Sequence, residues 1–177
     1  MASFNSGTSS SKNLPKENSN NREDGRQANG SKPKFIVSKE ELKARLSPIQ
    51  YQVTQLKSTE RPNSGEYNKF NKEGTYHCVV CNEKLFESET KYESGCGWPA
   101  FYDATSEKKL KFVKDYALVS SSNLLLLAKN ANLVRTEVLC NTCDAHLGHR
   151  FEDGPKSKGG KRYCINSAAL KFEPASS

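Results

Sequence analysis

Cys78-Val79-Val80-Cys81 and Cys140-Asn141-Thr142-Cys143 are the stretches that decide the fold of this chain. Each is a CxxC pair, and two such pairs present four thiolates to one tetrahedral metal ion, most often zinc. Four cysteine ligands saturate zinc and leave no position for water, so one structural Zn²⁺ per chain is predicted. Because 58 residues (82–139) separate the pairs, they must meet through tertiary structure. The alternative, a dithiol redox motif in one pair, is disfavoured because the two pairs match.

The two remaining cysteines lie outside these pairs. Cys96 stands in Ser-Gly-Cys-Gly-Trp-Pro, and Cys164 stands in Arg-Tyr-Cys-Ile-Asn. Two free thiols are what reversible thiol–disulfide chemistry requires, so the sequence predicts a zinc-containing redox enzyme. Six cysteines without a secretory signal indicate a reducing compartment, with the cytoplasm expected. Mitochondria are the second choice, because the first sixteen residues are Ser-rich and free of acids but contain no Arg.

Composition divides the chain into a polar tail and one domain. Residues 1–34 consist mainly of Ser, Asn, Gly, Lys and Arg. Such a segment buries too little apolar surface to offset its ordering entropy, so a disordered tail is expected before a domain at 35–177. No run approaches the ~20 apolar residues that span a bilayer, so no membrane association is predicted.

The net charge of +7 does not indicate a nucleic-acid partner. The tail contributes six Lys/Arg against three Asp/Glu, and residues 35–177 contribute 21 against 17, a net of +4. Four zinc-bound thiolates and one Zn²⁺ add −2, which leaves roughly +2 on the domain. That is an ordinary solubility charge, without a dense basic stripe. A monomer is the expected state.

The fold is predicted to be mainly β, a small antiparallel sheet or barrel preceded by two short helices. Ser38 with Glu41 forms a capping box ahead of Lys39–Leu46, and Ser47-Pro48 opens a second helix that fades near Ser58. Seven short β-rich runs follow, bounded by Gly, Asn and Asp. They are Thr75–Val79, Lys84–Glu87, Leu110–Val113, Val134–Leu139, His146–Phe151, Arg162–Asn166 and Leu170–Glu173.

One segment, Tyr116–Asn132, fits neither a turn nor a half-exposed strand. It contains four consecutive leucines, Leu124–Leu127, between two predicted strands. The simplest interpretation is a lengthened hairpin loop, inserted at about 116–132. Because exposed leucines form an unfavourable apolar patch, they are expected to fold back on the domain or to dock a partner.

Strand alternation places polar side chains around Cys164. Arg162, Cys164 and Asn166 share one face of the predicted strand, and Tyr163 and Ile165 point into the core. A guanidinium close to a thiol favours the thiolate, so Arg162 is expected to lower the pKa of Cys164. The alternative is a buried structural cysteine, but that does not explain the polar side chains of Arg162 and Asn166 beside it.

Histidine and tryptophan add to this constellation. His146-Leu147-Gly148-His149 holds two of the three histidines, and imidazole can donate a proton to a leaving oxygen. Zinc ligation is the alternative for these histidines, but the thiolates already fill that site. Trp98, the only tryptophan, lies two residues from Cys96 in a Gly-rich loop. Its indole is expected to form the wall of a pocket for a methyl group or a cation rather than to fill the core.

With these features identified, the chain resembles the B-type methionine-R-sulfoxide reductases, a family of two-cysteine, zinc-containing repair enzymes. The resemblance runs from about Leu46 to Phe172. It is carried by both CxxC pairs and by four stretches: Glu60-Arg61-Pro62 through Gly65-Glu66-Tyr67, Ser94–Phe101, Cys143–His149 and Arg162–Leu170.

The resemblance implies a function and a set of roles. The substrate would be methionine-R-sulfoxide, free or in proteins, with thioredoxin as the reductant. Cys164 would attack the sulfoxide sulfur, Cys96 would resolve the sulfenic acid as a disulfide, and His149 would protonate the oxygen. Supporting roles would fall to His146, Asp153, Arg162 and Asn166, and the methyl group would be received by Trp98 and Phe151.

Three departures from the family pattern are visible: Asn63 replaces an aromatic residue, Arg150 replaces a small apolar residue, and the segment 116–132 is about a dozen residues longer. Two other functions stay open at this stage. A zinc-ribbon binding module would need clustered basic and aromatic residues and would leave Cys96 and Cys164 without a task. A redox sensor without turnover would retain all of these residues, so only an assay separates it from the enzyme.

Overall fold

The computed structural model describes residues 35–117 and 134–176. The expected disordered tail and the leucine run of the expected insertion lie outside these described residues. Among the described residues there is no helix long and apolar enough to cross a membrane.

Two short helices open the domain, as predicted. Helix α1 spans Lys39–Arg45, and the Ser38 hydroxyl caps it by accepting from the backbone N–H of Glu41. Helix α2 spans Pro48–Leu56 and begins with a full capping box, in which Ser47 and Gln50 each bond the other's backbone N–H. These caps satisfy N–H groups that the first turn of a helix leaves without partners.

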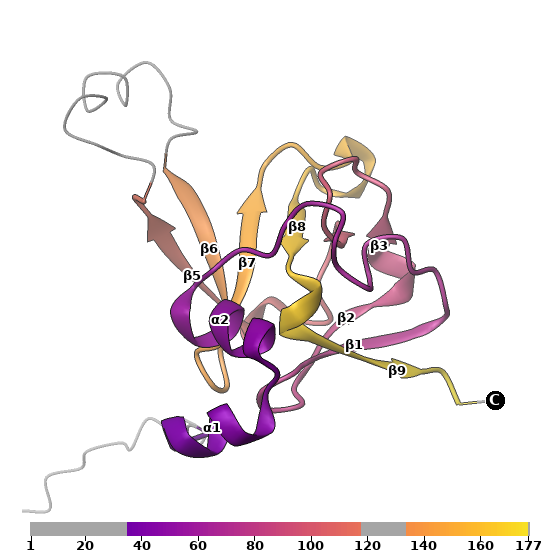
Figure 1. The fold of residues 1–177 in the computed structure, drawn as a ribbon. Coiled ribbons are helices and arrows are strands. Elements are labelled where there is room, and N and C mark those ends of the chain that lie inside the picture. Colours follow the sequence, from indigo (N-terminus) through magenta and orange to yellow (C-terminus); the bar gives the residue numbers. More distant parts are fainter. Residues whose placement is uncertain (1–34, 118–133, 177) are drawn as a thin grey trace, which may run out of the picture. The chain divides into compact units, whose positions relative to one another are not determined.

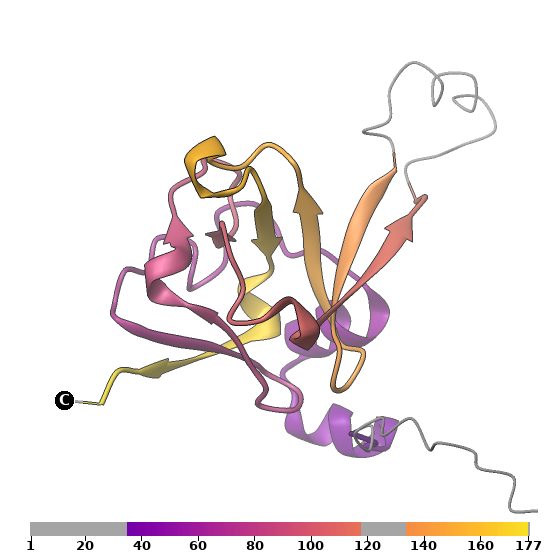
Figure 2. The same ribbon diagram turned by 180° about the vertical axis from the view of Figure 1, so that it is seen from behind.

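Within residues 35–117 and 134–176, nine strands form two antiparallel sheets, which confirms the predicted fold class (Figure 1). The strands are β1 Gly74–Cys78, β2 Lys84–Glu87, β3 Lys91–Tyr92, β4 Ala100–Phe101, β5 Leu110–Asp115, β6 Arg135–Cys140, β7 His146–Phe151, β8 Arg162–Ile165 and β9 Leu170–Pro174. The smaller sheet has the order β2-β1-β9, and the larger has the order β3-β4-β8-β7-β6-β5. Strands β5 to β8 stand side by side in both views (Figures 1 and 2).

All seven predicted strands are present, with small differences at their ends. Strand β5 continues to Asp115, two residues beyond the predicted end, because it pairs with β6 as far as Arg135. Strands β3 and β4 were missed because each has only two residues, too few to display an alternating pattern.

An aromatic core holds the domain together. Tyr76, Phe86, Phe101 and Tyr163 are fully buried, and the rings of Phe86 and Phe101 stack with their centroids 4.4 Å apart. Tyr163 and Ile165 of β8 both point into this core, as strand alternation predicted. Consequently Arg162 and Cys164 of the same strand face the other side of the sheet.

Helix α2 packs against β7 and against η5, the 3-10 turn Ser167–Ala169 that follows β8. Its Val53 is fully buried. These contacts bring the chain after α2, including Thr59 and Glu60, to the face of the large sheet on which Cys164 lies.

Candidate functional site

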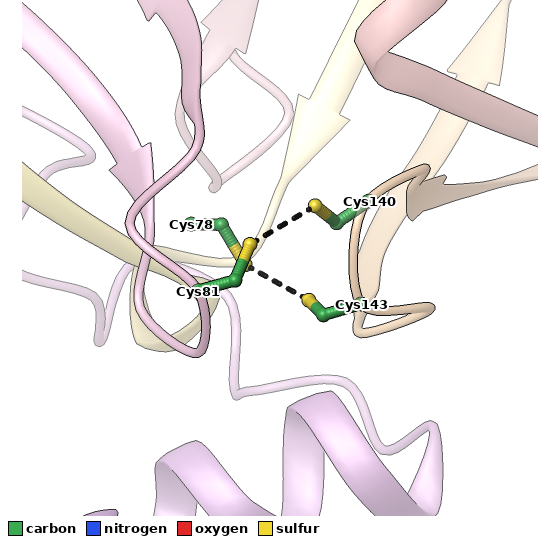
Figure 3. A group of neighbouring side chains, drawn as sticks. All are labelled: Cys78, Cys81, Cys140 and Cys143. Atoms are coloured by element: carbon green, nitrogen blue, oxygen red, sulfur yellow. Dashed lines mark hydrogen bonds between the residues drawn. The ribbon is translucent and has the colours of Figure 1, made fainter. Parts of the chain in front are cut away.

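The four cysteines of the CxxC pairs converge at one point (Figure 3). All four sulfur atoms lie within 4.8 Å of one another; Cys78 Sγ is 3.6 Å from Cys143 Sγ, and Cys81 Sγ is 3.5 Å from Cys140 Sγ. A tetrahedral zinc ion with Zn–S bonds of ~2.3 Å requires sulfur–sulfur separations of about 3.8 Å. The cluster therefore fits a tetrahedral thiophilic metal ion, and it joins the end of β1 to the end of β6.

The two CxxC turns, here called knuckles, have the same backbone conformation and hydrogen bond. In each, the residue after the second cysteine, Asn82 or Asp144, has a left-handed conformation, with φ of 61° and 58°. Its N–H donates to the carbonyl oxygen of the first cysteine at 2.9 Å in both knuckles. Asn and Asp tolerate this conformation better than most residues, so the sequence supplies the turn that aims both sulfurs of a pair inward.

His77 is not part of this cluster. Its Nδ1 lies 3.1 Å from the Asn82 carbonyl oxygen, and its Nε2 lies 2.7 Å from Thr75 Oγ1 and 3.3 Å from a Glu173 carboxylate oxygen. Both ring nitrogens are thus engaged away from the sulfur atoms, as expected for a strand residue that is not a ligand.

The two cysteines outside the cluster lie next to each other. Cys164 is in β8, and Cys96 is in the loop between β3 and β4, with 3.3 Å between their Sγ atoms. Gly97 shapes this loop with φ of 92°, and a Cβ there would overlap Pro62. The Gly97 carbonyl also accepts from the N–H of Asn63, so the Arg61–Gly65 turn holds the cysteine loop in place.

The two thiols share their ionisation. Hydrogen bonding with Cys164 lowers the pKa of Cys96 to about 5. The pKa of Cys164 is raised, first by its hydrogen bond with Cys96 and then by burial, although the charge of Arg162 acts in the lowering direction. The expected effect of Arg162 is therefore present, but the expected net direction for Cys164 is wrong, because the less buried Cys96 takes the negative charge first.

Arg162 and Asp153 form a rigid pair beside the cysteines. Arg162 donates two hydrogen bonds of 2.8 Å to the Asp153 carboxylate, and its guanidinium lies 4.4 Å from the centroid of the Phe151 ring. The hydrogen bonds from Arg162 lower the pKa of Asp153. Because Arg162 is held in this way, its positive charge stays near both sulfurs.

His149 lies opposite Cys164 in the pairing of β7 with β8. Its Nε2 is 2.8 Å from Asp115 Oδ2, and the same oxygen accepts a 2.6 Å bond from Arg135. Burial lowers the pKa of His149, and the hydrogen bond with Asp115 opposes that effect in part. Asp115 stays ionised, with its pKa lowered to about 2: burial raises it, but bonds from Ala117 N–H, His149 and Arg135 outweigh burial.

His146, the first residue of β7, is almost fully buried. Its Nδ1 is 2.8 Å from Glu137, whose other carboxylate oxygen accepts a 2.9 Å bond from Lys57. The rings of His146 and His149 meet edge to face, with centroids 5.6 Å apart. His146 therefore contacts His149 but does not line the pocket described next.

A small pocket of about 90 Å³ lies beside Cys164 and His149. Its lining combines one thiol, one imidazole, two aromatic rings and several polar groups, namely Cys164, His149, Trp98, Phe151, Thr59, Arg135, Gly148 and Asn166. Trp98 is fixed by a 3.1 Å bond from its Nε1 to the Glu60 carbonyl oxygen. Gly148 is required here, because a Cβ on it would overlap the Cys164 carbonyl oxygen.

Asn166 is buried, and its side chain hydrogen-bonds backbone groups of two other segments. Its side chain donates to the Leu147 carbonyl oxygen at 2.9 Å and accepts from the N–H of Glu60 at 3.1 Å. The Glu60 carboxylate in turn accepts from the N–H groups of Ser167 and Ala168. Asn166 thus ties three segments together at the floor of the pocket.

Three residues around the histidines were not among the predicted site residues: Asp115 and Glu137, which bond His149 and His146, and Arg135, which bonds Asp115. Arg135 and Glu137 stand two positions apart in β6, on the face that Cys164 shares through the paired strands β6 to β8. Two charges in alternation, followed by the apolar run Val138–Cys140, were the available signal. Asp115 was missed because strand β5 was predicted to end at Val113.

The chain matches a known protein family. The model of the SelR domain matches residues 46–174, which is most of the chain and includes all six cysteines.

Individual relatives agree with this match. The chain is 54% identical to methionine-R-sulfoxide reductase B1 of Drosophila melanogaster, over 81% of this chain and 70% of the relative. It is 50% identical to the peptide methionine sulfoxide reductase MsrB of Burkholderia thailandensis, over 75% and 84% of the two chains. A mouse relative, methionine-R-sulfoxide reductase B3, mitochondrial, is 47% identical over 81% of this chain and 51% of its own length.

Proposed function

The chain belongs to the SelR-domain family of methionine-R-sulfoxide reductases, and from this premise we propose that it reduces the R epimer of methionine sulfoxide to methionine by way of a cysteine sulfenic acid and an intramolecular disulfide. The observation that carries the proposed mechanism is the meeting of Cys96 Sγ and Cys164 Sγ at 3.3 Å, directly beside His149. A thiol pair at this distance forms a disulfide with little backbone movement.

In the first step, Cys164 attacks the sulfoxide sulfur within the small pocket. The proton shared with Cys96 moves toward Cys96, which leaves the nucleophilic anion on Cys164. Trp98 and Phe151 receive the methyl group, and His149 delivers a proton to the sulfoxide oxygen. The protonated oxygen then moves from the substrate sulfur to the Cys164 sulfur. The substrate S–O bond and the new sulfur–sulfur bond both break, so methionine leaves and Cys164 becomes a sulfenic acid.

In the second step, Cys96 attacks the sulfenic sulfur of Cys164. A disulfide forms, and the oxygen leaves as water, so one sulfoxide is reduced for each pair of thiols oxidised. An external dithiol of the thioredoxin class then restores both thiols. The need for thioredoxin supports a compartment that supplies it, for which we propose the cytoplasm first and mitochondria second.

Zinc is the proposed occupant of the four-cysteine cluster. The ligands would be Cys78, Cys81, Cys140 and Cys143, and the ion would bind the end of β1 to the end of β6. Four thiolates leave no open coordination position, so the role is structural.

The test is a coupled assay with the separate R and S epimers of a methionine sulfoxide substrate, thioredoxin, its reductase and NADPH. Turnover of the R epimer alone is expected, and the Cys164→Ser variant serves as the control. Binding without turnover of either epimer would favour a redox sensor and would overturn the proposal.

A further inference from the structure

The pocket beside Cys164 is too small for a whole methionine sulfoxide residue and its neighbours. Its volume of about 90 Å³ is well below the roughly 300 Å³ at which typical small-molecule sites begin. Only the end of the side chain therefore enters it, and the rest of the substrate must lie on the adjoining surface.

A wider groove of about 560 Å³ adjoins this pocket and shares Arg135 and Phe151 with it. Its basic lining residues come from four strands, β5 to β8, and its acidic residues come from the turn after β7. Four cations and two acids line it: Lys114, Arg135, Arg150 and Arg162, against Glu152 and Asp153.

The arginines of the groove have unused hydrogen-bonding capacity. The Nε–H groups of Arg135 and Arg150 are buried and have no acceptor among the described residues. A buried donor without a partner is unfavourable, so such groups mark places where an acceptor is expected to bind. Lys114 is exposed and has no ion-pair partner within the part of the chain that the structure describes.

Two of these guanidinium groups are also held in fixed positions. Arg150 lies 4.7 Å from the centroid of the Phe112 ring, and Arg162 lies 4.4 Å from that of Phe151. The acidic partner of Arg150, Glu152, is largely exposed, so solvent weakens that ion pair, whereas two hydrogen bonds join Arg162 to Asp153. A fixed cation with a weakly held partner, such as Arg150, is suited to binding a further carboxylate.

We propose that this groove binds a carboxylate of the substrate while its sulfoxide occupies the pocket, so that the enzyme prefers methionine sulfoxide next to an acidic group. The proposal rests on the proposed function and names a specificity for it. The carboxylate has two sources: the side chain of an Asp or Glu neighbour in a polypeptide, or the α-carboxylate of free methionine sulfoxide.

The experiment compares kcat/KM for blocked five-residue peptides with a central methionine-R-sulfoxide. The flanking residues are Ala, Asp or Lys, and free methionine-R-sulfoxide is compared with its amide. The Asp peptide is expected to exceed the Ala peptide by about two- to fivefold, the range of exposed ion pairs. High salt should reduce this preference.

Lys114→Gln with Arg150→Gln should bring the Asp-to-Ala ratio close to one, and Lys114→Glu with Arg150→Glu should invert it. Lys39→Gln with Lys69→Gln removes an equal charge at exposed positions outside the groove and should leave the ratio as it is. A preference among the peptides assigns the groove to acidic neighbours. A preference only for the free acid over its amide assigns it to the α-carboxylate. Equal values in both comparisons overturn the proposal.

Binding separates this outcome from failure of the proposed function. Trp98, the only tryptophan, lines the pocket and reports binding of each peptide to the Cys164→Ser variant by fluorescence. Tighter binding of the Asp peptide without turnover by the unmodified enzyme would overturn the function and leave the groove assignment intact. Turnover with equal binding of the Asp and Ala peptides, and of the free acid and its amide, would overturn the groove assignment alone.

Discussion

His149 lies directly opposite Cys164 across the antiparallel pair of β7 and β8, and Glu137 lies opposite His149 across β6 and β7. One row across three strands therefore carries a carboxylate, an imidazole and a thiol. The spacing of this row is fixed by the hydrogen bonds of the sheet rather than by loops, which suits a site whose groups must meet within a few tenths of an ångström.

Replacing Cys164 and replacing Cys96 should block different steps of the reaction. Cys164→Ser is expected to abolish turnover and to leave no sulfenic acid that a trapping reagent can label. Cys96→Ser should still release about one methionine per enzyme but should not be recycled by thioredoxin, because no disulfide can form. Methionine release and NADPH oxidation measure the two steps. Full recycling by Cys96→Ser would show that another thiol resolves the sulfenic acid.

The shared ionisation of the thiols predicts an effect of Cys96 on Cys164. The hydrogen bond with Cys96 is the largest cause that raises the pKa of Cys164. Removing that partner in Cys96→Ser should therefore lower the pKa of Cys164, so its alkylation by iodoacetamide should begin at lower pH than in the unmodified enzyme. Mass spectrometry of the peptide containing Cys164, at low conversion, gives the measurement. If alkylation of Cys164 in the Cys96→Ser variant begins at the same or a higher pH, the two thiols do not share a proton as proposed.

The charges beside His149 predict opposite shifts of the pH–rate profile in two variants. If the protonated imidazole is the acid, the rate of methionine release should fall as pH rises through the pKa of His149. The Asp115 carboxylate raises this pKa and the Arg135 charge lowers it. Asp115→Asn should therefore move the pH profile to lower pH, and Arg135→Gln should move it to higher pH. Single-turnover rates across a pH series measure both shifts.

His149→Asn provides the control for that series. It should slow sulfenic acid formation by roughly 10²–10⁴-fold, as expected for loss of a positioned general acid, and should remove the pH dependence. Near-normal rates in this variant would transfer the acid role, with His146 as the next candidate because its ring contacts that of His149.

The sequence predicted the residues of this site better than their arrangement. Both CxxC pairs, the Cys164 strand and the helix caps follow from short-range rules, namely ligand spacing, strand alternation and capping. Glu60 shows why other features could not be predicted: its carboxylate bonds backbone groups more than 100 positions away, and no local pattern encodes such a partner. The net pKa direction of Cys164 depends in the same way on a sulfur atom 68 positions distant.

The four-cysteine cluster predicts a stoichiometric metal with a structural role. Replacing any one of Cys78, Cys81, Cys140 or Cys143 with Ser should release zinc and lower the melting temperature sharply, because metal binding and folding are coupled. Elemental analysis and thermal unfolding measure the two effects. Cys96→Ser is the matched control, since it removes a thiol outside the cluster and should retain zinc. A metal-free protein with unchanged stability would contradict the assignment.

The segment between β5 and β6 gives the last prediction. The pairing of these two strands ends at Asp115 and Arg135. Their side chains bond each other, and Asp115 also bonds His149. Replacing Ser120–Asn132 with a short Gly/Asn turn keeps both of them, so zinc content and R-epimer reduction should be retained. Loss of turnover in a folded, zinc-containing deletion variant would mean that the segment takes part in the active site. Retained activity would instead assign the pair of Asp115 and Arg135, and not the segment beyond it, to the support of His149.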